Sequence, residues 1–194
     1  MPHPRLILAS ASPRRAELLR EHGYDFTVIE SPLGEPVEFP DDMSPVERAQ
    51  SSSYFKAKSV AEVVGEGWVL GADTIAALAG RVFGKPADRD DARMILKSLS
   101  GTTHQVITGL TLLDASSGAR LIRQDSTDVI MRRLGELEIE EYLDSGAWEG
   151  KAGAYGIQDK GDAFVERIEG SFTNVVGLPM ELLARMLIDF SRMV

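Results

Sequence analysis

The sequence predicts an α/β protein built on a mixed β-sheet with helices on its faces. In the first half, short apolar runs typical of buried strands alternate with helical patterns, which favours parallel strand connections. In the second half, two long β-rich runs flank the turn Ser116-Ser-Gly118, which indicates an antiparallel hairpin. The 194 residues contain no internal repeat or extended linker, so we expect residues 1–194 to form a single domain.

A strand–helix–strand unit is predicted at the beginning of the chain. The apolar run Leu6–Ala9 is typical of a short buried strand. Ser12 then fits a helix N-cap, and Pro13 fits the first helical position, where its missing N–H costs nothing. Phe26–Ile29 is the second predicted strand.

A capping box predicts the start of the next helix. Ser44-Pro-Val-Glu47 combines a serine cap, a proline at the first helical position and a glutamate three residues after the cap, and the helix should reach about Val64. The apolar run Trp68–Ala72 then predicts a buried strand that ends at Asp73 and Thr74. Ligands of open α/β sheets gather beyond the carboxyl ends of strands, so these two side chains are expected beside a cleft.

Turn signals and periodicity predict the remaining elements. The turn Ala79-Gly-Arg81 should pair residues 75–78 with a short following strand, and Gly84-Lys-Pro86 should form a rigid connection. The elements expected after it are a helix over 88–99, a hairpin of 106–113 and 120–131, a helix over 137–146, a glycine-rich loop over 150–158, a strand over 163–168 and a last helix over about 179–190.

Composition excludes several classes of site. The net charge of −9 argues against nonspecific binding to a nucleic acid polymer or an anionic membrane, because both need a basic face. The chain has no cysteine, and its three scattered histidines lack metal-ligand spacing; we expect His104 to enter a strand and bond to backbone. No apolar run approaches the roughly 18 residues that span a bilayer, so we expect a cytoplasmic, soluble protein.

Ser10-Ala-Ser-Pro-Arg-Arg15 has the outline of an anion site. Free backbone N–H groups at a helix start, together with the helix dipole, favour negative charge beyond the strand. Arg14 and Arg15 add planar donors that match phosphate geometry. The same segment also fits a well-capped amphipathic helix with two solvated arginines, and the motif alone does not separate the two interpretations.

Other segments offer complementary chemistry. Asp73 and Glu35 supply carboxylates, Lys56 and Lys85 supply cations, and residues 150–158 form a loop on which backbone approaches a ligand closely. Each feature also has an ordinary interpretation, as a turn residue for Asp73 and Lys85 and as a solvated surface charge for Lys56 and Glu35. None of these segments is specific on its own.

The fixed order of the motifs is more specific than any one of them. From Leu6 to about Leu187, the series resembles the Maf family of nucleoside triphosphate pyrophosphatases. The segments that carry the resemblance are Ser10-Ala-Ser-Pro-Arg-Arg15, Gly71-Ala-Asp-Thr74, Gly84-Lys-Pro86, Ser100-Gly-Thr-Thr-His-Gln-Val106, Lys151-Ala-Gly-Ala-Tyr-Gly-Ile-Gln158 and Gly170-Ser-Phe-Thr-Asn-Val-Val-Gly-Leu-Pro179.

The resemblance implies a fold similar to that of the inosine triphosphate pyrophosphatases. That fold is an elongated mixed sheet flanked by helices, with two lobes around a cleft. The implied reaction is hydrolysis of a nucleoside triphosphate to the monophosphate and pyrophosphate with a divalent cation, Mg²⁺ or alternatively Mn²⁺. A homodimer is implied as well.

The family's functional positions match particular residues of this chain. The resemblance implies Asp73 as proton acceptor and metal ligand, Lys85 as a catalytic cation, Ser10, Arg15, Lys56 and Lys85 as phosphate contacts, Arg14, Thr74 and Gln158 in substrate choice, and Glu35 near the metal. Lys58 competes with Lys56, because Ser51-Ser-Ser-Tyr-Phe-Lys56 departs from the family's usual pattern. An ordinary aspartate, with a pKa of about 3.9, is a weak base for water, so Asp73 is expected to act on a metal-bound water or to bind the metal itself.

Two positions distinguish the branches of the family. Thr74 after Asp73, together with Gln158, resembles the branch that acts on dTTP and UTP, whereas the branch that acts on 7-methyl-GTP carries glutamine after the aspartate. The expected base pocket has Ala154 and Tyr155 as walls and the Gln158 amide at a pyrimidine edge. The alternatives are a 7-methyl-GTP pyrophosphatase and a nucleotide-sensing regulator of cell division.

Overall fold

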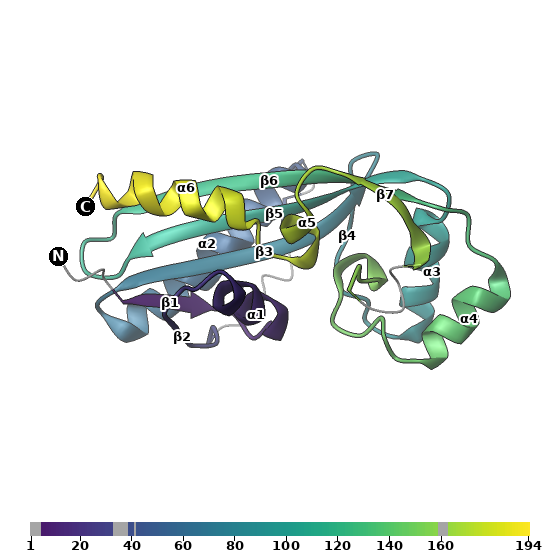
Figure 1. The fold of residues 1–194 in the computed structure, drawn as a ribbon, viewed down its shortest axis with the longest axis horizontal. Helices are drawn as coiled ribbons and strands as arrows, with labels where there is room; N and C mark the ends of the chain where they lie inside the picture. The colour runs from purple at the N-terminus through teal and green to yellow at the C-terminus, as the bar shows by residue number, and fades with distance from the viewer. Residues whose placement is uncertain (1–4, 33–38, 41, 159–162) are drawn as a thin grey trace.

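A computed structural model describes residues 5–32, 39–40, 42–158 and 163–194 (Figure 1). The strands are β1 (Leu6–Ala9), β2 (Phe26–Val28), β3 (Trp68–Leu78), β4 (Arg81–Phe83), β5 (Thr103–Asp114), β6 (Arg120–Met131) and β7 (Val165–Glu169). The helices are α1 (Pro13–Glu21), α2 (Pro45–Val64), α3 (Arg89–Leu99), α4 (Glu136–Asp144), the 3₁₀ turn η1 (Ala152–Ala154), α5 (Phe172–Val176) and α6 (Met180–Ser191).

One elongated mixed sheet runs along the molecule. Its strand order is β2-β1-β3-β5-β6-β7, with β4 paired to the far part of β3. The first three strands in this order are parallel, and β5, β6 and β7 join them in antiparallel ladders. The predicted fold class is therefore confirmed, including the parallel first half and the long hairpin.

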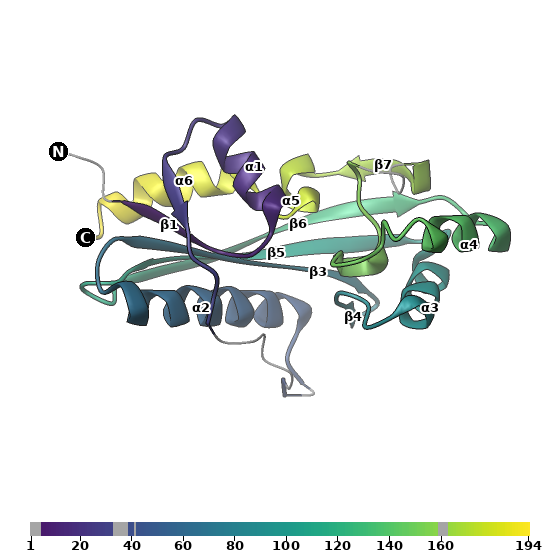
Figure 2. The same ribbon diagram turned by 90° about the horizontal axis from the view of Figure 1, so that it is seen from below.

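Helices cover both faces of the sheet and one of its ends (Figure 2). Helix α2 lies on one face, α1, α5 and α6 lie on the other, and α3 and α4 pack at the far end. The close approach of α2 depends on Gly71 and Gly109, because a Cβ atom there would lie 2.1 Å from the Ser53 oxygen and 2.3 Å from the Ala49 oxygen. Only glycine fits at these two positions.

The molecule has two lobes, one at each end of the long sheet. We call β1, β2, α1, α2 and α6 the first lobe, and β4, α3, α4, η1 and β7 the second lobe (Figure 1). One apolar core continues through both, from Leu8 and Phe190 in the first lobe to Leu96 and Phe164 in the second. In the described part of the chain, no helix combines the length and apolarity that a membrane crossing requires.

The edge of β3 has a gap that matters for function. Strand β1 ends with Ala9 opposite Gly71, and β4 begins to pair at Ala76. Among the described strands, none pairs with residues 72–75 on that edge. Because β1 is parallel to β3, the carboxyl end of β1 and the beginning of α1 both lie at this gap.

The prediction that the third strand ends at Asp73 is wrong. Strand β3 continues to Leu78, and β5 pairs with it along almost its whole length. The two polar residues are tolerated inside the strand because each has a partner. The Thr74 hydroxyl lies 2.9 Å from that of Thr108 on β5, and Asp73 is paired with a lysine of α2.

Local signals place most helix starts correctly. The Ser44 capping box of α2 is present in full, and the helix ends at Gly65 in the left-handed conformation. Ser12 stands at the N-cap of α1, but its side chain makes no capping bond; instead its N–H donates to Ser10 Oγ at 3.2 Å. Helix α5, with only five residues, is too short to show a period in the sequence.

Candidate active site

A cleft of about 570 Å³ opens at the gap in the sheet. Both lobes contribute to its lining, which confirms the predicted cleft between lobes. The first lobe contributes residues 9–15 and Lys56, the second contributes Lys85, residues 149–152 and residues 155–158, and strand β3 contributes Thr74. Most of the residues singled out in the sequence therefore meet here, although they are as far as about 150 positions apart in the chain.

Arg15 is a buried cation held by three hydrogen bonds. Only 9% of it is exposed. Its Nε donates to the Gly177 oxygen at 2.8 Å, Nη1 donates to Ser10 Oγ at 3.1 Å, and Nη2 donates to Thr74 Oγ1 at 3.1 Å. The interpretation as a solvated arginine is therefore wrong for Arg15, because its guanidinium joins the start of α1, strand β3 and the end of α5.

Arg14 and Ser10 complete the first-lobe side of the cleft. Arg14 is half-buried and lines the cleft at the first turn of α1. Ser10 is buried, and its hydroxyl accepts from both Arg15 and the Ser12 N–H. The start of α1 thus combines a helix dipole with two guanidinium groups, which is an arrangement that favours an anion.

Asp73 forms an ion pair with Lys56, which lines the cleft, but Asp73 itself is not among the lining residues. Lys56 Nζ donates to Asp73 Oδ1 at 2.5 Å, and the two side chains are 11% and 12% exposed. Lys56 lines the cleft, whereas Lys58 lies on the exposed side of α2, 3.7 Å from Glu62. The geometry therefore places Lys56, rather than Lys58, in the site.

The site draws on both faces of the sheet. Asp73 reaches Lys56 on the α2 face, whereas Thr74 reaches Arg15 on the α1 face. Successive side chains of a strand point to opposite faces, so a single cleft contacts both only where the edge of the sheet is open. The gap at residues 72–75 provides that opening.

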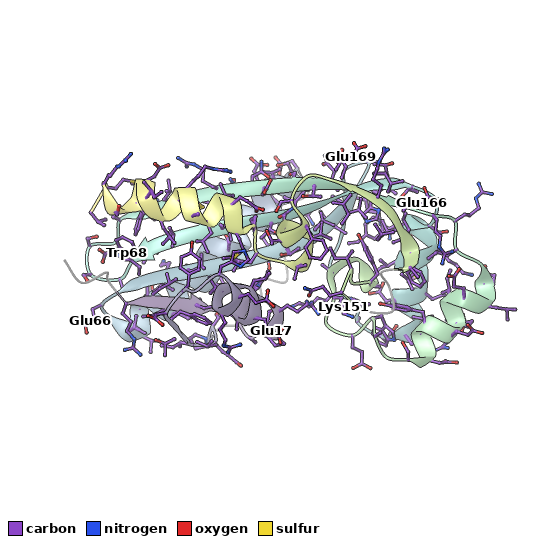
Figure 3. The ribbon with its side chains drawn as sticks, viewed as in Figure 1. Glu17, Glu66, Trp68, Lys151, Glu166 and Glu169 are labelled. Atoms are coloured by element: carbon purple, nitrogen blue, oxygen red, sulfur yellow. The ribbon has the colours of Figure 1, made fainter. Side chains whose placement is uncertain are left out.

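The second lobe adds two lysines. Lys85, on the connection after β4, is exposed and lines the cleft. Lys151, labelled in Figure 3, is only 7% exposed and lines the cleft at the beginning of η1. Lys151 was not predicted to be a site residue, and the signal available in the sequence was its position at the start of the glycine-rich motif.

The remaining wall of the second lobe is largely apolar. Ala152, Tyr155 and Ile157 line it, and the Gln158 side chain at its end is exposed. The prediction of Ala154 as a wall residue is wrong, because Ala154 is fully buried. An aromatic and aliphatic surface beside one amide is suited to a planar ring with polar edges.

His104, on strand β5, contacts Tyr155 of this wall. Its Nε2 lies 2.7 Å from the Tyr155 hydroxyl, so the predicted bond to backbone is wrong. Burial lowers the pKa of His104 to about 4 and raises the pKa of Tyr155 above its ordinary value. Both side chains are therefore neutral near pH 7.

The carboxylates of the site are less completely described. Glu35 lies outside the described residues, so the structure does not place it. Glu30 and Glu149 line the cleft. Within the described ranges, no three acidic, histidine or cysteine residues come together as a ready metal cage.

A cation-rich cleft at a helix start, in the gap of a mixed α/β sheet, defines an anion-binding site of the phosphate type. Comparison with known families agrees, because the family model described as "Maf-like protein" matches residues 5–190. The chain belongs to the Maf-like family.

Its relatives are similar over nearly their whole lengths. It is 42% identical to a protein of Pelotomaculum thermopropionicum over 95% of this chain and 96% of the relative. It is 44% identical to one of Alkaliphilus metalliredigens over 91% of each. It is 43% identical to one of Syntrophus aciditrophicus over 95% of this chain and 89% of the relative. All three relatives are named dTTP/UTP pyrophosphatase.

Proposed function

We propose that this protein hydrolyses dTTP and UTP to the nucleoside monophosphate and pyrophosphate. The observation that carries the proposal is the gathering of cations at one cleft in a chain of net charge −9. Among the described residues, Arg14, Arg15, Lys56, Lys85 and Lys151 line it, together with the carboxylates Glu30 and Glu149. A triphosphate is the kind of ligand that such a local excess of positive charge fits, and the names of the relatives support the choice.

The proposed reaction is attack of water on the α-phosphate. The water oxygen forms a bond to phosphorus, the bond from that phosphorus to the bridging oxygen breaks, and pyrophosphate leaves. Oδ1 of Asp73 accepts from Lys56, which leaves Oδ2 to take the water proton. Arg15 and Lys85 stabilise the charge that develops on the phosphate oxygens and the leaving group.

A divalent cation fits the donor set. Mg²⁺ commonly uses one or two carboxylates together with substrate phosphates, so it does not require a complete protein cage. Asp73 would hold it, with Glu35 as a proposed second ligand outside the described residues. A bound cation would supply positive charge at the phosphate oxygens.

Product analysis on a substrate panel tests the function. Purified protein with Mg²⁺, and separately with Mn²⁺, is given dTTP, UTP, ATP, GTP and 7-methyl-GTP, and both pyrophosphate and orthophosphate are measured. We expect pyrophosphate from dTTP and UTP first. Orthophosphate as the first product would reject the reaction, and preference for 7-methyl-GTP would reject the substrate while keeping the reaction. Binding without turnover would favour the nucleotide-sensing alternative.

Three finer properties are proposed from the family resemblance. They are a magnesium cofactor, a cytoplasmic location and a homodimer. Light scattering of the purified protein tests the homodimer, and its mass should be twice that of the 194-residue chain.

A further inference from the structure

We propose that His104 is a positioning residue for the nucleobase side of the cleft. It holds the Tyr155 hydroxyl, and through Tyr155 it fixes the second-lobe wall on which the base of the substrate lies. The inference rests on the proposed function, since it assumes a nucleotide in the cleft. It adds a residue that contacts neither the phosphates nor the reacting atoms.

The distribution of chemistry in the cleft separates a phosphate side from a base side. Arg15, Lys56 and the start of α1 concentrate charge on the first lobe. The second lobe also contributes the cations Lys85 and Lys151, but its wall over residues 155–158 presents Tyr155, Ile157 and the Gln158 amide. A base stacks on apolar and aromatic surface and pairs its edge with an amide, so this wall is the one that matches it.

The His104–Tyr155 contact ties that wall to the sheet. His104 belongs to β5, is 1% exposed, and lies 2.7 Å from the Tyr155 hydroxyl through Nε2. The two rings also meet edge to face, with centroids 5.5 Å apart and planes at 89°. Tyr155 thus links the loop over 150–158 to β5.

The hydrogen bond between His104 and Tyr155 can form in either neutral tautomer of the imidazole. Nδ1 is buried and has no hydrogen-bond partner among the described residues, so Nε2 makes the hydrogen bond of the ring. With its proton on Nε2 the ring donates to the Tyr155 oxygen, and with its proton on Nδ1 it accepts from the Tyr155 O–H. Both cases join the same two atoms, so the anchoring of Tyr155 does not depend on the tautomer.

The loop needs such an anchor because part of its backbone is strained. Ala154, directly before Tyr155, has φ +61°, a conformation that is uncommon for a residue with a side chain. On its other side Gly153 has φ +73°, and a Cβ atom there would be crowded, at 3.1 Å from the Ala76 Cβ and 3.2 Å from the Tyr155 ring. Packing and the His104 bond hold the backbone where it would otherwise relax.

The test compares two single variants with a matched control. His104→Phe and Tyr155→Phe each remove the hydrogen bond and keep a ring. Tyr142→Phe is the control, because Tyr142 is equally buried in the second lobe and lies outside the cleft lining. We expect KM for dTTP to rise about tenfold in both test variants, with kcat within threefold of the wild type, and no change in the control.

Two further measurements distinguish positioning from general damage. Inorganic tripolyphosphate carries no base, so its inhibition constant against dTTP hydrolysis should stay within twofold in His104→Phe and Tyr155→Phe. His104→Gln keeps an N–H donor and should recover most of the wild-type KM. In the folded wild-type protein, nitrogen NMR should find the His104 ring neutral near pH 7, and Tyr155→Phe should shift its Nε2 signal.

The failures are separable. A wild-type protein that does not hydrolyse dTTP would overturn the proposed function. If the wild-type protein hydrolyses dTTP and the Tyr155→Phe variant keeps the wild-type KM, the role of His104 is overturned and the proposed function stands. An equal loss of tripolyphosphate and dTTP binding would also overturn it, because that result marks collapse of the whole cleft.

Discussion

Replacing Asp73 by asparagine should have two effects that the structure allows to be separated. The substitution removes the proton acceptor, and it also removes the negative charge 2.5 Å from Lys56 Nζ. Loss of a positioned general base lowers kcat by roughly 10²–10⁴-fold. The second effect acts on stability and is independent of substrate.

The size of the stability effect follows from burial. Breaking a fully buried ion pair costs about 3–5 kcal/mol, because an uncompensated charge is left behind. Lys56 and Asp73 retain 11% and 12% exposure at the rim of a cleft, so we expect a smaller loss of about 2 kcal/mol. For a chain of this size, that corresponds to a fall in Tm of about 4–8 °C.

A double variant separates the two effects. Lys56→Gln combined with Asp73→Asn removes both charges and should recover most of the lost stability, while activity stays at least about 100-fold below the wild type. The assays are thermal unfolding and pyrophosphate release from dTTP. A folded Asp73→Asn protein with kcat within threefold of the wild type would refute the base assignment, and an unchanged Tm would refute the reasoning on the ion pair.

The remaining predictions concern five other positions. Arg15→Lys should remove about 2–4 kcal/mol of transition-state stabilisation, because lysine cannot reproduce the three hydrogen bonds of the guanidinium group. This loss is measured as a lower kcat/KM, and a wild-type kcat/KM would contradict it. Thr74→Gln should slow hydrolysis of every nucleotide, because it removes the hydroxyl bonded to Arg15. Thr74→Ser keeps that hydroxyl and should leave the rate of hydrolysis unchanged. If Thr74→Gln instead changes only the preference among bases, Thr74 has a direct role in substrate choice. Lys85→Ala should lower kcat/KM by about tenfold and Lys58→Ala should leave it unchanged, as steady-state assays would show. Since burial lowers the pKa of His104 to about 4, the unfolded chain binds a proton between pH 6.5 and 4 that the folded chain does not, so stability falls by about 3 kcal/mol as the pH falls through this window. Denaturant unfolding of His104→Phe should show a flatter pH dependence than that of the wild type.

Sequence reasoning succeeds where a feature is local. The Ser44 capping box fixes the start of α2, and the turn at Ala79 and Gly80 fixes the β3–β4 pairing, because each depends on a few neighbouring residues. The order of the short motifs was equally informative for the cleft. It carries the family resemblance that predicted Ser10, Lys85 and Gln158 in one site, and all three residues line the cleft.

Prediction from the sequence fails where the partner of a residue lies far along the chain. Thr74 looks like the end of a strand until Thr108, 34 positions away, is seen opposite its hydroxyl. His104 looks like an isolated histidine until Tyr155, 51 positions away, supplies its hydrogen bond. Lys151 is buried, but its own segment gave no sign of this, because the residues that pack around it depend on the fold.

The acidic surface and the cationic cleft together restrict the kind of anion that fits. At physiological ionic strength, charges separated by more than about 8 Å are largely screened, so a ligand responds mainly to the charge in its immediate surroundings. A nucleoside triphosphate is short enough for all its phosphates to lie among Arg15, Lys56 and Lys85. A nucleic acid polymer would extend beyond the cleft onto a surface belonging to a chain of net charge −9, where each further phosphate meets repulsion instead of a counter-charge. The same composition that disfavours polymers therefore leaves the cleft available to a single nucleotide.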